Sequence, residues 1–183
     1  MQLMMPRLIL VKYFLMLKVA IMMGSDSDAS KMAPAWETLK GFGIEFEVRV
    51  LSAHRSPDAT VEFAKNAREN GIGVIICAAG GAAHLAGVVA AVTSLPVIAV
   101  PISQPVLDGL DSLLSMVQMP KGIPVATVSI DGARNAGLLA ARIIGLTEEQ
   151  VMDAYDSFRQ EMADEVAEKD KKLAERLAEG GNV

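Results

Sequence analysis

The chain is 183 residues long, carries a net charge of −5 at pH 7 and has a single cysteine, Cys77. This length suits one domain with an ample core, and one cysteine excludes an internal disulfide, which favours a cytoplasmic setting. Eleven acidic and five basic side chains fall in residues 147–183, which leaves the body before them close to neutral, at +1. No basic patch interleaved with aromatic residues is visible, so we expect no nucleic-acid ligand.

Residues 1–16 form an apolar N-terminal stretch. Pro6, Arg7 and Lys12 interrupt it, and no small-residue cleavage site follows. We therefore expect an extension ahead of the first strand, or a start site placed too early. A secretory signal peptide is the alternative.

A short apolar run, Lys18–Met23, breaks at Gly24 and is followed by Ser25-Asp26-Ser27-Asp28. This pattern predicts a buried strand, a tight turn and the N-terminus of a helix. Backbone N–H groups and two hydroxyls suit an anion there, but the two carboxylates argue against phosphate alone, so an anion next to a polyol fits better. The alternative is a helix cap without a ligand, because Ser and Asp favour that position.

The next segments alternate between helix and strand signals. A first helix is expected over about residues 27–40, and residues 45–50 alternate polar with apolar, as in a strand at the edge of a sheet. Ser56 suits an N-cap and Pro57 suits the first helical position, which predicts a second helix that runs to Asn70.

The middle of the chain is strongly apolar, since residues 72–120 contain no Lys or Arg and only two acidic residues. Glycine pairs, His84 and prolines divide this stretch into runs of strand length, so we expect buried strands at 74–79 and 96–100 and no membrane span. The helix between them, 85–93, is apolar on every side. This favours a tight homo-oligomer with these helices at its centre.

The last third of the chain continues the alternation. A helix is expected around 107–117, a fifth strand at 125–130 and a helix at 134–144. Residues 147–183 then form one long amphipathic helix, which we expect to pack across a neighbouring subunit. Its apolar stripe consists of Val151, Tyr155, Phe158, Met162, Val166, Leu173 and Leu177.

Five strands that alternate with helices, the second edge-like and the others buried, indicate a doubly wound α/β domain. We predict three layers, α/β/α, around a parallel sheet of the flavodoxin-like order 2-1-3-4-5, because this order places strand two at an edge. The domain then spans residues 17–146, between the extension at 1–16 and the C-terminal helix at 147–183.

Ligands of such sheets bind beyond the carboxyl ends of the strands, and the polar residues of interest follow those ends. They are Gly24–Asp28 after the first strand, Ser52–Ser56 after the second, Gly80–His84 after the third and Ser103–Gln104 after the fourth. Both histidines are among them. The sequence therefore predicts one site at this edge of the sheet.

His54 belongs to the residue type that both gives and takes a proton near neutrality, since a histidine ordinarily has a pKa of about 6.5. Arg55 beside it supplies a fixed charge for a phosphate. The alternative is that both side chains merely pair with acids. For His84, after a glycine pair, a structural role and direct chemistry are both open, and Cys77 fits a buried core residue better than a nucleophile.

Nothing in the chain points to a metal or a cofactor. The two histidines and one cysteine are not at ligand spacing, and neither a Walker-type loop nor a dinucleotide fingerprint is present. The residues therefore predict a cofactor-free site that moves protons on a phosphorylated, hydroxyl-bearing small molecule.

Five motifs stand in order along the chain: Gly-Ser-Asp-Ser-Asp at 24–28, Ser-Ala-His-Arg-Ser-Pro-Asp at 52–58, Ala-Gly-Gly-Ala-Ala-His-Leu at 79–85, residues 109–120 with Gly-Ile-Pro at 122–124, and Asn-Ala-Gly-Leu-Leu-Ala-Ala at 135–141. Together, from about Val19 to Gly145, they resemble the N5-carboxyaminoimidazole ribonucleotide mutases of de novo purine synthesis. The resemblance implies a flavodoxin-like subunit of a homo-octamer. It also implies conversion of that ribonucleotide to 4-carboxy-5-aminoimidazole ribonucleotide without metal or nucleotide.

The resemblance further implies a role for each matching residue. The N-carboxylate would leave as CO₂ and stay enclosed while ring C4 turns toward it, with His54 acting first as acid and then as base. Ser25, Arg55 and Ser52 would hold the 5′-phosphate, and Asp28 the ribose hydroxyls. The expected substrate-binding set is Ser25, Ser27, Asp28, Ser52, Arg55, Gly80, Gly81, His84 and Leu85, of which the last four would form a wall around CO₂ and the imidazole.

The chain departs from the family pattern at two positions, since the family usually has a glycine where Ala78 stands and a proline where Ala86 stands. A related branch carboxylates aminoimidazole ribonucleotide directly with CO₂. That branch commonly has Ser-Ser-Ser-Asp and Ser-Ala-His-Lys, so Ser-Asp-Ser-Asp and Ser-Ala-His-Arg favour the mutase. The direct carboxylase, and a phosphoribosyl-binding protein without activity, are the alternatives.

Overall fold

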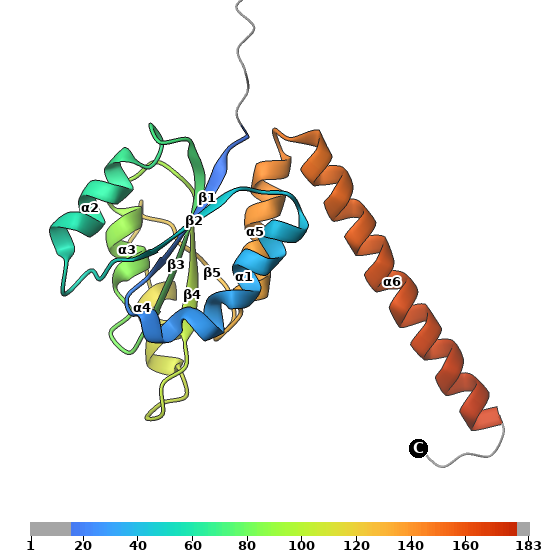
Figure 1. Ribbon diagram of the computed structural model, residues 1–183. Coiled ribbons are helices and arrows are strands. Elements are labelled where there is room, and N and C mark those ends of the chain that lie inside the picture. The colour runs from blue at the N-terminus through green and yellow to red at the C-terminus, as the bar shows by residue number, and fades with distance from the viewer. Residues whose placement is uncertain (1–15, 179–183) are drawn as a thin grey trace, which may run out of the picture.

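The computed structural model describes residues 16–178 and arranges them as a five-stranded sheet between two layers of helices (Figure 1). The strand order is β2-β1-β3-β4-β5, and every neighbouring pair is parallel. This confirms the predicted flavodoxin-like order, with β2 at an edge. The expected N-terminal extension lies outside the described residues except for Met16, which packs against the core.

The element bounds follow the expected alternation. The strands are β1 (Lys18–Met23), β2 (Phe46–Val50), β3 (Ile72–Gly80), β4 (Val97–Ile102) and β5 (Ala126–Thr127). The helices are the 3₁₀ turn η1 (Asp26–Asp28), α1 (Ala29–Gly41), α2 (Pro57–Asn66), α3 (Leu85–Ala90), α4 (Leu110–Val117), α5 (Ala133–Gly145) and α6 (Glu149–Ala178).

The two faces of the sheet each carry their own core, because successive side chains of a strand point to opposite faces. In β1, Val19 and Ile21 pack in one core with side chains of α1 and α5, whereas Ala20 and Met22 pack in the other with side chains of α2, α3 and α4. All four of these residues are fully buried. Strands covered on both faces read as continuous apolar runs, which explains the absence of alternation in β1, β3 and β4.

The fifth strand is shorter than the predicted 125–130. Only Ala126 and Thr127 pair in register with β4, and Ala126 is exposed, so the expectation of a buried fifth strand was wrong. Beyond Thr127 the chain continues to run alongside β4. Val128 N–H donates to the Ala99 carbonyl, and Asp131 N–H donates to the Pro101 carbonyl. An edge strand such as β5 pairs with one neighbour only. Where that pairing begins and ends depends on tertiary contacts more than on residue type, so the sequence of this segment could not define the ends of the strand.

Three helices are also shorter than predicted. α2 ends at Asn66 instead of Asn70, and α3 at Ala90 instead of residue 93. α4 begins at Leu110 instead of residue 107, because Asp108 (φ 50°) and Gly109 (φ 88°) are left-handed and cannot continue a right-handed helix. Each error falls at a helix end, where turn chemistry competes with helix propensity.

Burial within one chain explains part of the apolar character of helix α3. Leu85, Ala86 and Val89 are buried against the sheet, while Gly87 and Val88 are half-buried. Its expected place at the centre of an oligomer stays a prediction.

Helix α6 leaves the body after its first turns and extends away from it (Figure 1). Near its start, Val151 is buried and Tyr155 and Phe158 pack against Phe42, which follows α1. All side chains from residue 161 to residue 178 are exposed. Despite its length, α6 is too polar to cross a membrane, and no other helix within residues 16–178 is long and apolar enough to do so.

Candidate active site

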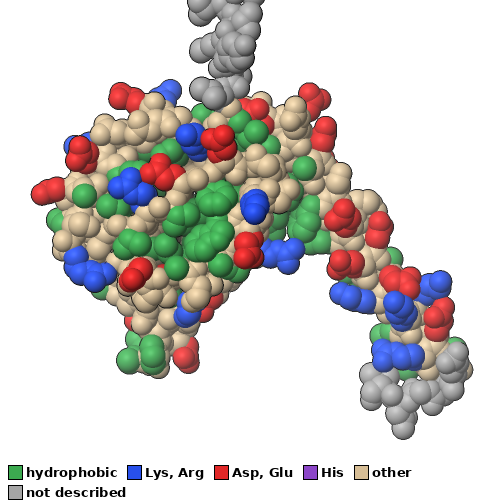
Figure 2. Space-filling view, in the orientation of Figure 1, with side chains coloured by type: hydrophobic (Ala, Val, Ile, Leu, Met, Phe, Trp, Pro, Cys, Tyr) green, Lys and Arg blue, Asp and Glu red, His purple; other side chains and the backbone are tan. Residues whose placement is uncertain are grey.

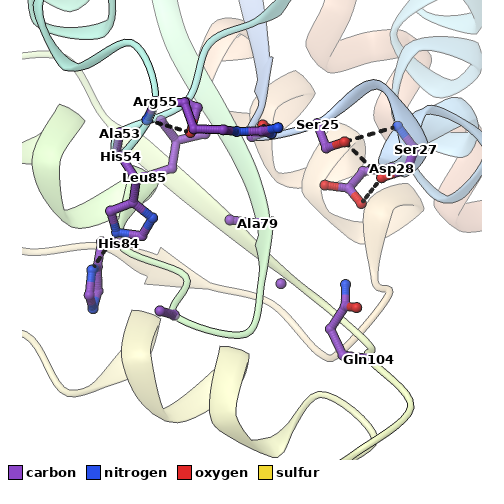
Figure 3. Close-up of a pocket in the computed structure, with 14 residues that line it drawn as sticks. Ser25, Ser27, Asp28, Ala53, His54, Arg55, Ala79, His84, Leu85 and Gln104 are labelled. Atoms are coloured by element: carbon purple, nitrogen blue, oxygen red, sulfur yellow. Dashed lines mark hydrogen bonds between the residues drawn. The ribbon is translucent and has the colours of Figure 1, made fainter.

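Four loops that follow β1, β2, β3 and β4 enclose a cavity of about 270 Å³ at the carboxyl edge of the sheet (Figure 3). Nine of the ten predicted site residues line it, and Gly81 does not. The lining residues are Gly24, Ser25, Ser27, Asp28, Ser52, Ala53, His54, Arg55, Ala79, Gly80, Ala82, His84, Leu85 and Gln104. Gln104 is the polar side chain that the predicted set lacked, although its place soon after the fourth strand was a signal for it.

The loop after β1 is a short turn closed by serine hydroxyls. Ser25 caps η1, with its Oγ accepting a hydrogen bond from Ser27 N–H at 3.4 Å and another from Ser27 Oγ at 2.9 Å. The hydroxyls and the backbone N–H groups of this turn are donors that suit an anion. Asp26 and Asp28 lie in the same turn, and their carboxylates can only accept hydrogen bonds. The pairing of an anion with a polyol at this turn stays a prediction.

Asp28 is the buried carboxylate of the cavity, only 7 % exposed. Burial raises its pKa above the usual value, and nearby Asp131 and Asp26 add to this effect, while a hydrogen bond from Ser27 and the charge of Lys31 oppose it. A carboxylate held in this way is poorly solvated. A ligand that donates hydroxyl hydrogens to it would therefore offset the cost of this burial.

We expect Asp28→Asn to stabilise the unliganded protein at pH 7, because it removes the cost of burying an ionised carboxylate. The gain should be about 0.5–2 kcal/mol, the usual range for a single stabilising substitution. A raised pKa means that the folded state binds more protons than the unfolded state, so the free energy of unfolding falls as pH rises through the titration of Asp28. Urea unfolding at pH 7 should show the difference in the free energy of unfolding. This difference should vanish below about pH 3, where the carboxyl is protonated in both states. Asp156→Asn, at an exposed position of α6, is the control. A less stable Asp28→Asn protein at pH 7 would contradict this account.

The loop after β2 is a compact turn that presents Arg55. Ser56 occupies the N-cap position of α2, but its side chain makes no cap bond, which corrects the predicted role. Its Oγ instead accepts from Ser52 N–H at 3.0 Å and donates to the Ser52 carbonyl at 3.2 Å. Ser52 Oγ in turn accepts from Arg55 N–H at 3.1 Å. The turn is thus closed by serine hydroxyls before any ligand binds.

The Arg55 side chain crosses from the β2 loop to the β1 loop. Its Nη2 donates to the Gly24 carbonyl at 2.6 Å, so the guanidinium lies close to Ser25 (Figure 3). A guanidinium has five donors, so others stay available for a ligand. Arg55 and the η1 turn therefore lie side by side at one end of the cavity.

The two histidines contact each other at one side of the cavity (Figure 3). His54 Nε2 lies 2.8 Å from His84 Nδ1, and the rings meet edge to face with centroids 4.9 Å apart. This hydrogen bond needs one donor and one acceptor, so at least one imidazole is neutral while it persists. The ring nitrogen of either histidine can be the donor, depending on the tautomer.

The glycine loop after β3 is held from behind by α4. Gly81 N–H donates to Ser112 Oγ at 2.9 Å, and Ser112 Oγ donates to the Ile102 carbonyl at 2.8 Å. Gly81 has φ +66°, a conformation that suits glycine, and it faces Ser112 instead of the cavity. Ala78 and Ala86 are both fully buried in the core, so these two departures lie behind the cavity wall.

Ser112→Ala is expected to lower the free energy of unfolding by about 1–3 kcal/mol, because it leaves the Gly81 N–H and the Ile102 carbonyl without their partner. Ser112 is fully buried, so water cannot replace the hydroxyl. Urea unfolding measures the loss. Ser157→Ala, which removes an exposed hydroxyl of α6, should change stability by less than about 0.5 kcal/mol. Equal effects of the two substitutions would mean that the Gly81 loop does not depend on α4.

Cys77 lies in β3 and is fully buried, where burial raises the pKa of its thiol far above the usual range. A thiol in this state is a core side chain and not a nucleophile. Within residues 16–178, no group of three or more His, Cys, Asp and Glu side chains is placed to hold a metal ion.

Comparison with known proteins identifies the family to which this constellation belongs. The model of the family described as AIR carboxylase matches residues 18–165. The chain belongs to the AIR carboxylase family. A curated relative, the N5-carboxyaminoimidazole ribonucleotide mutase of Thermotoga maritima, is 53 % identical over 85 % of this chain and 91 % of its own length.

Two further proteins, one compared by sequence and one by structure, are similar to this member of the AIR carboxylase family. The N5-carboxyaminoimidazole ribonucleotide mutase of Mycobacterium tuberculosis is 56 % identical over 88 % of this chain and 92 % of its own length. A crystal structure of Treponema denticola PurE is similar with a TM-score of 0.76 and 33 % identity, covering 85 % of this chain and 97 % of that one. Sequence and fold therefore agree on the same family.

Proposed function

We propose that this protein is a 5-(carboxyamino)imidazole ribonucleotide mutase of de novo purine biosynthesis, which converts N5-carboxyaminoimidazole ribonucleotide to 4-carboxy-5-aminoimidazole ribonucleotide. The observation that carries this proposal is one cavity that contains a histidine pair, an arginine-serine anion subsite and the buried Asp28. The two relatives named as this mutase, more than half identical over most of the chain, support it.

In the proposed mechanism His54 acts first as an acid. It donates a proton to the exocyclic nitrogen as the bond between that nitrogen and the carboxyl carbon breaks, which releases CO₂ and leaves aminoimidazole ribonucleotide. The enclosed CO₂ then meets ring C4, whose electron pair forms the new C–C bond. C4 now carries both a hydrogen and a carboxylate, and neutral His54 removes that hydrogen as a proton, so the ring becomes aromatic again.

The remaining lining residues would hold the substrate. Ser25, Arg55 and Ser52 suit the 5′-phosphate because a guanidinium, hydroxyls and a helix N-terminus converge there, and Ser27 completes that turn. Asp28 suits the ribose hydroxyls, since a carboxylate accepts two hydrogen bonds. Gly80, with Gly81 behind it, and His84 and Leu85 would form the wall against CO₂ and the imidazole. No step of this scheme needs a cofactor.

The test is to supply purified protein with freshly prepared N5-carboxyaminoimidazole ribonucleotide, without ATP or metal and at low bicarbonate, and to follow the C4-carboxylated product. Product formation at a rate far above the spontaneous reaction is expected. Product only from aminoimidazole ribonucleotide with high bicarbonate would instead establish the direct carboxylase. No product from either substrate would leave a phosphoribosyl-binding protein without activity.

We further propose that the chain works in the cytoplasm as a homo-oligomer, an octamer by the family resemblance. Its outer surface supports association, because apolar side chains lie exposed on and before α4, as Val106, Leu107, Leu110, Leu114 and Val117. The free half of α6 likewise exposes Met162, Val166 and Leu177 among its charges (Figure 2). Exposed apolar side chains grouped on one element are typical of subunit interfaces. Sedimentation equilibrium measures the number of subunits.

A further inference from the structure

Gln104 is a polar side chain of the cavity to which the family resemblance gives no role. It is the second residue after β4, and in Figure 3 it lies across the cavity from His54 and His84. Its amide makes no hydrogen bond to any residue between 16 and 178. A Cβ added at Gly80 would overlap the Gln104 amide, so this amide lies directly against the backbone of the proposed CO₂ wall.

The residue before it, Ser103, is fixed through all of its polar groups. Ser103 N–H and Oγ donate to the two carboxylate oxygens of Asp131 at 2.9 and 2.6 Å. Lys31 Nζ donates to the Ser103 carbonyl at 3.0 Å, contacts Ser103 Oγ and pairs with Asp131 at 3.4 Å. We call Lys31, Ser103 and Asp131 the Ser103 clamp.

The Ser103 clamp joins three segments that are distant in sequence, namely α1, the loop after β4 and the loop before α5. Asp131 adopts a left-handed conformation, φ 54°, which non-glycine residues rarely adopt and which surrounding contacts must maintain. Burial opposes ionisation of Asp131, but hydrogen bonds from Ser103 and Lys31 outweigh it and lower the pKa of this carboxyl. The clamp thus holds the backbone of the residue before Gln104 by hydrogen bonds to its N–H and its carbonyl.

The chemistry of the reacting carbon gives such a group a task. When C4 carries both the hydrogen and the new carboxylate it is tetrahedral, so these two substituents lie on opposite faces of the ring. A base on one side of the cavity therefore requires the carboxylate to point toward the other side. Asp28 would repel a carboxylate, and Lys31 is engaged in the clamp. The Gln104 amide is neutral and has two free N–H donors.

We propose that Gln104 donates a hydrogen bond to the carboxylate on C4, on the ring face opposite His54, and that the Ser103 clamp positions it. This inference rests on the proposed mutase function. It makes Gln104 a specificity-determining residue that distinguishes the carboxylated ribonucleotide from the decarboxylated one.

The test compares the binding of 4-carboxy-5-aminoimidazole ribonucleotide and 5-aminoimidazole ribonucleotide by calorimetry. Gln104→Glu puts a like charge against the carboxylate and should weaken binding of the carboxylated ribonucleotide about 10- to 100-fold, the range of a lost charge-assisted hydrogen bond. Binding of the decarboxylated ribonucleotide should change by less than about threefold. Gln104→Ala should have the same selectivity with a smaller loss. Asn66→Asp adds the same charge at an exposed position of α2 and should change neither affinity.

Ser103→Ala tests the clamp with the same two ligands. It removes the hydroxyl contacts to Lys31 and Asp131. Like Gln104→Glu, it should therefore weaken binding of the carboxylated ribonucleotide more than binding of the decarboxylated one. Ser103→Thr, which keeps the hydroxyl, should restore the preference. A purely structural role would weaken both ligands equally. Equal weakening by Gln104→Glu, or no effect, would overturn the assignment of Gln104 while the wild type still binds both ligands. A wild-type protein that binds neither ligand would overturn the proposed function, and this inference with it.

Discussion

Replacement of His54 by Asn should reduce turnover about 10²- to 10⁴-fold while leaving the fold and nucleotide binding intact. Asn keeps hydrogen-bonding groups at this position but cannot take up and return a proton, and the proposed mechanism needs both steps from one residue. His54 is exposed at the cavity wall, so the substitution buries no unpaired group. Steady-state kinetics measures kcat, calorimetry measures the Kd of the ribonucleotide, and thermal unfolding confirms that the variant is folded.

His84→Asn is the matched comparison, since it removes the same kind of ring from the other side of the His54–His84 hydrogen bond. We expect a smaller loss of kcat, because His84 would act through His54 and the cavity wall. Near-normal turnover of His54→Asn together with an inactive His84→Asn would move the acid–base role to His84.

Replacement of Arg55 by Ala should weaken binding of the ribonucleotide about 10- to 150-fold, as expected for loss of a hydrogen bond between charged groups. The guanidinium is already held against the β1 loop by the 2.6 Å bond to the Gly24 carbonyl, so little ordering is needed when phosphate arrives. Binding of the corresponding nucleoside, which lacks the phosphate, should be almost unchanged. Calorimetry with both ligands separates the two effects.

Arg68→Ala is the control for this prediction, because it removes an equal charge from an exposed turn after α2. Its effect on either ligand should be less than about twofold. If Arg55→Ala weakened the nucleotide and the nucleoside equally, Arg55 would support the turn between β2 and α2 instead of binding the phosphate.

Much of the fold could be predicted because its signals are local. A strand covered on both faces needs apolar residues throughout, as in β3, whereas the alternation at 45–50 is what an edge strand requires. The right-handed crossover rule and the edge position of β2 then leave few strand orders. The errors concern β5 and the ends of α2, α3 and α4, where the outcome depends on contacts between distant segments.

Most of the candidate site was predictable for a related reason. In a doubly wound sheet the loops after neighbouring parallel strands meet at one edge, so motifs far apart in sequence are brought together by topology alone. The orientation of each side chain within those loops was not predictable. Gly81 belongs to the predicted set but faces Ser112, and Gln104 was outside the set but faces the cavity.

The sequence by itself determined the order of strands and helices, the two-sided core, the edge of the sheet where the cavity lies and the residue types available there. Each of these follows from periodicity and composition along the chain. Only the tertiary structure decided that His54 contacts His84, that Arg55 reaches Gly24 and that Lys31, Ser103 and Asp131 converge behind Gln104. These contacts join segments separated by about 30 to 100 positions. Their geometry depends on strand register and helix packing, which are properties of the whole fold and are not encoded in any single motif.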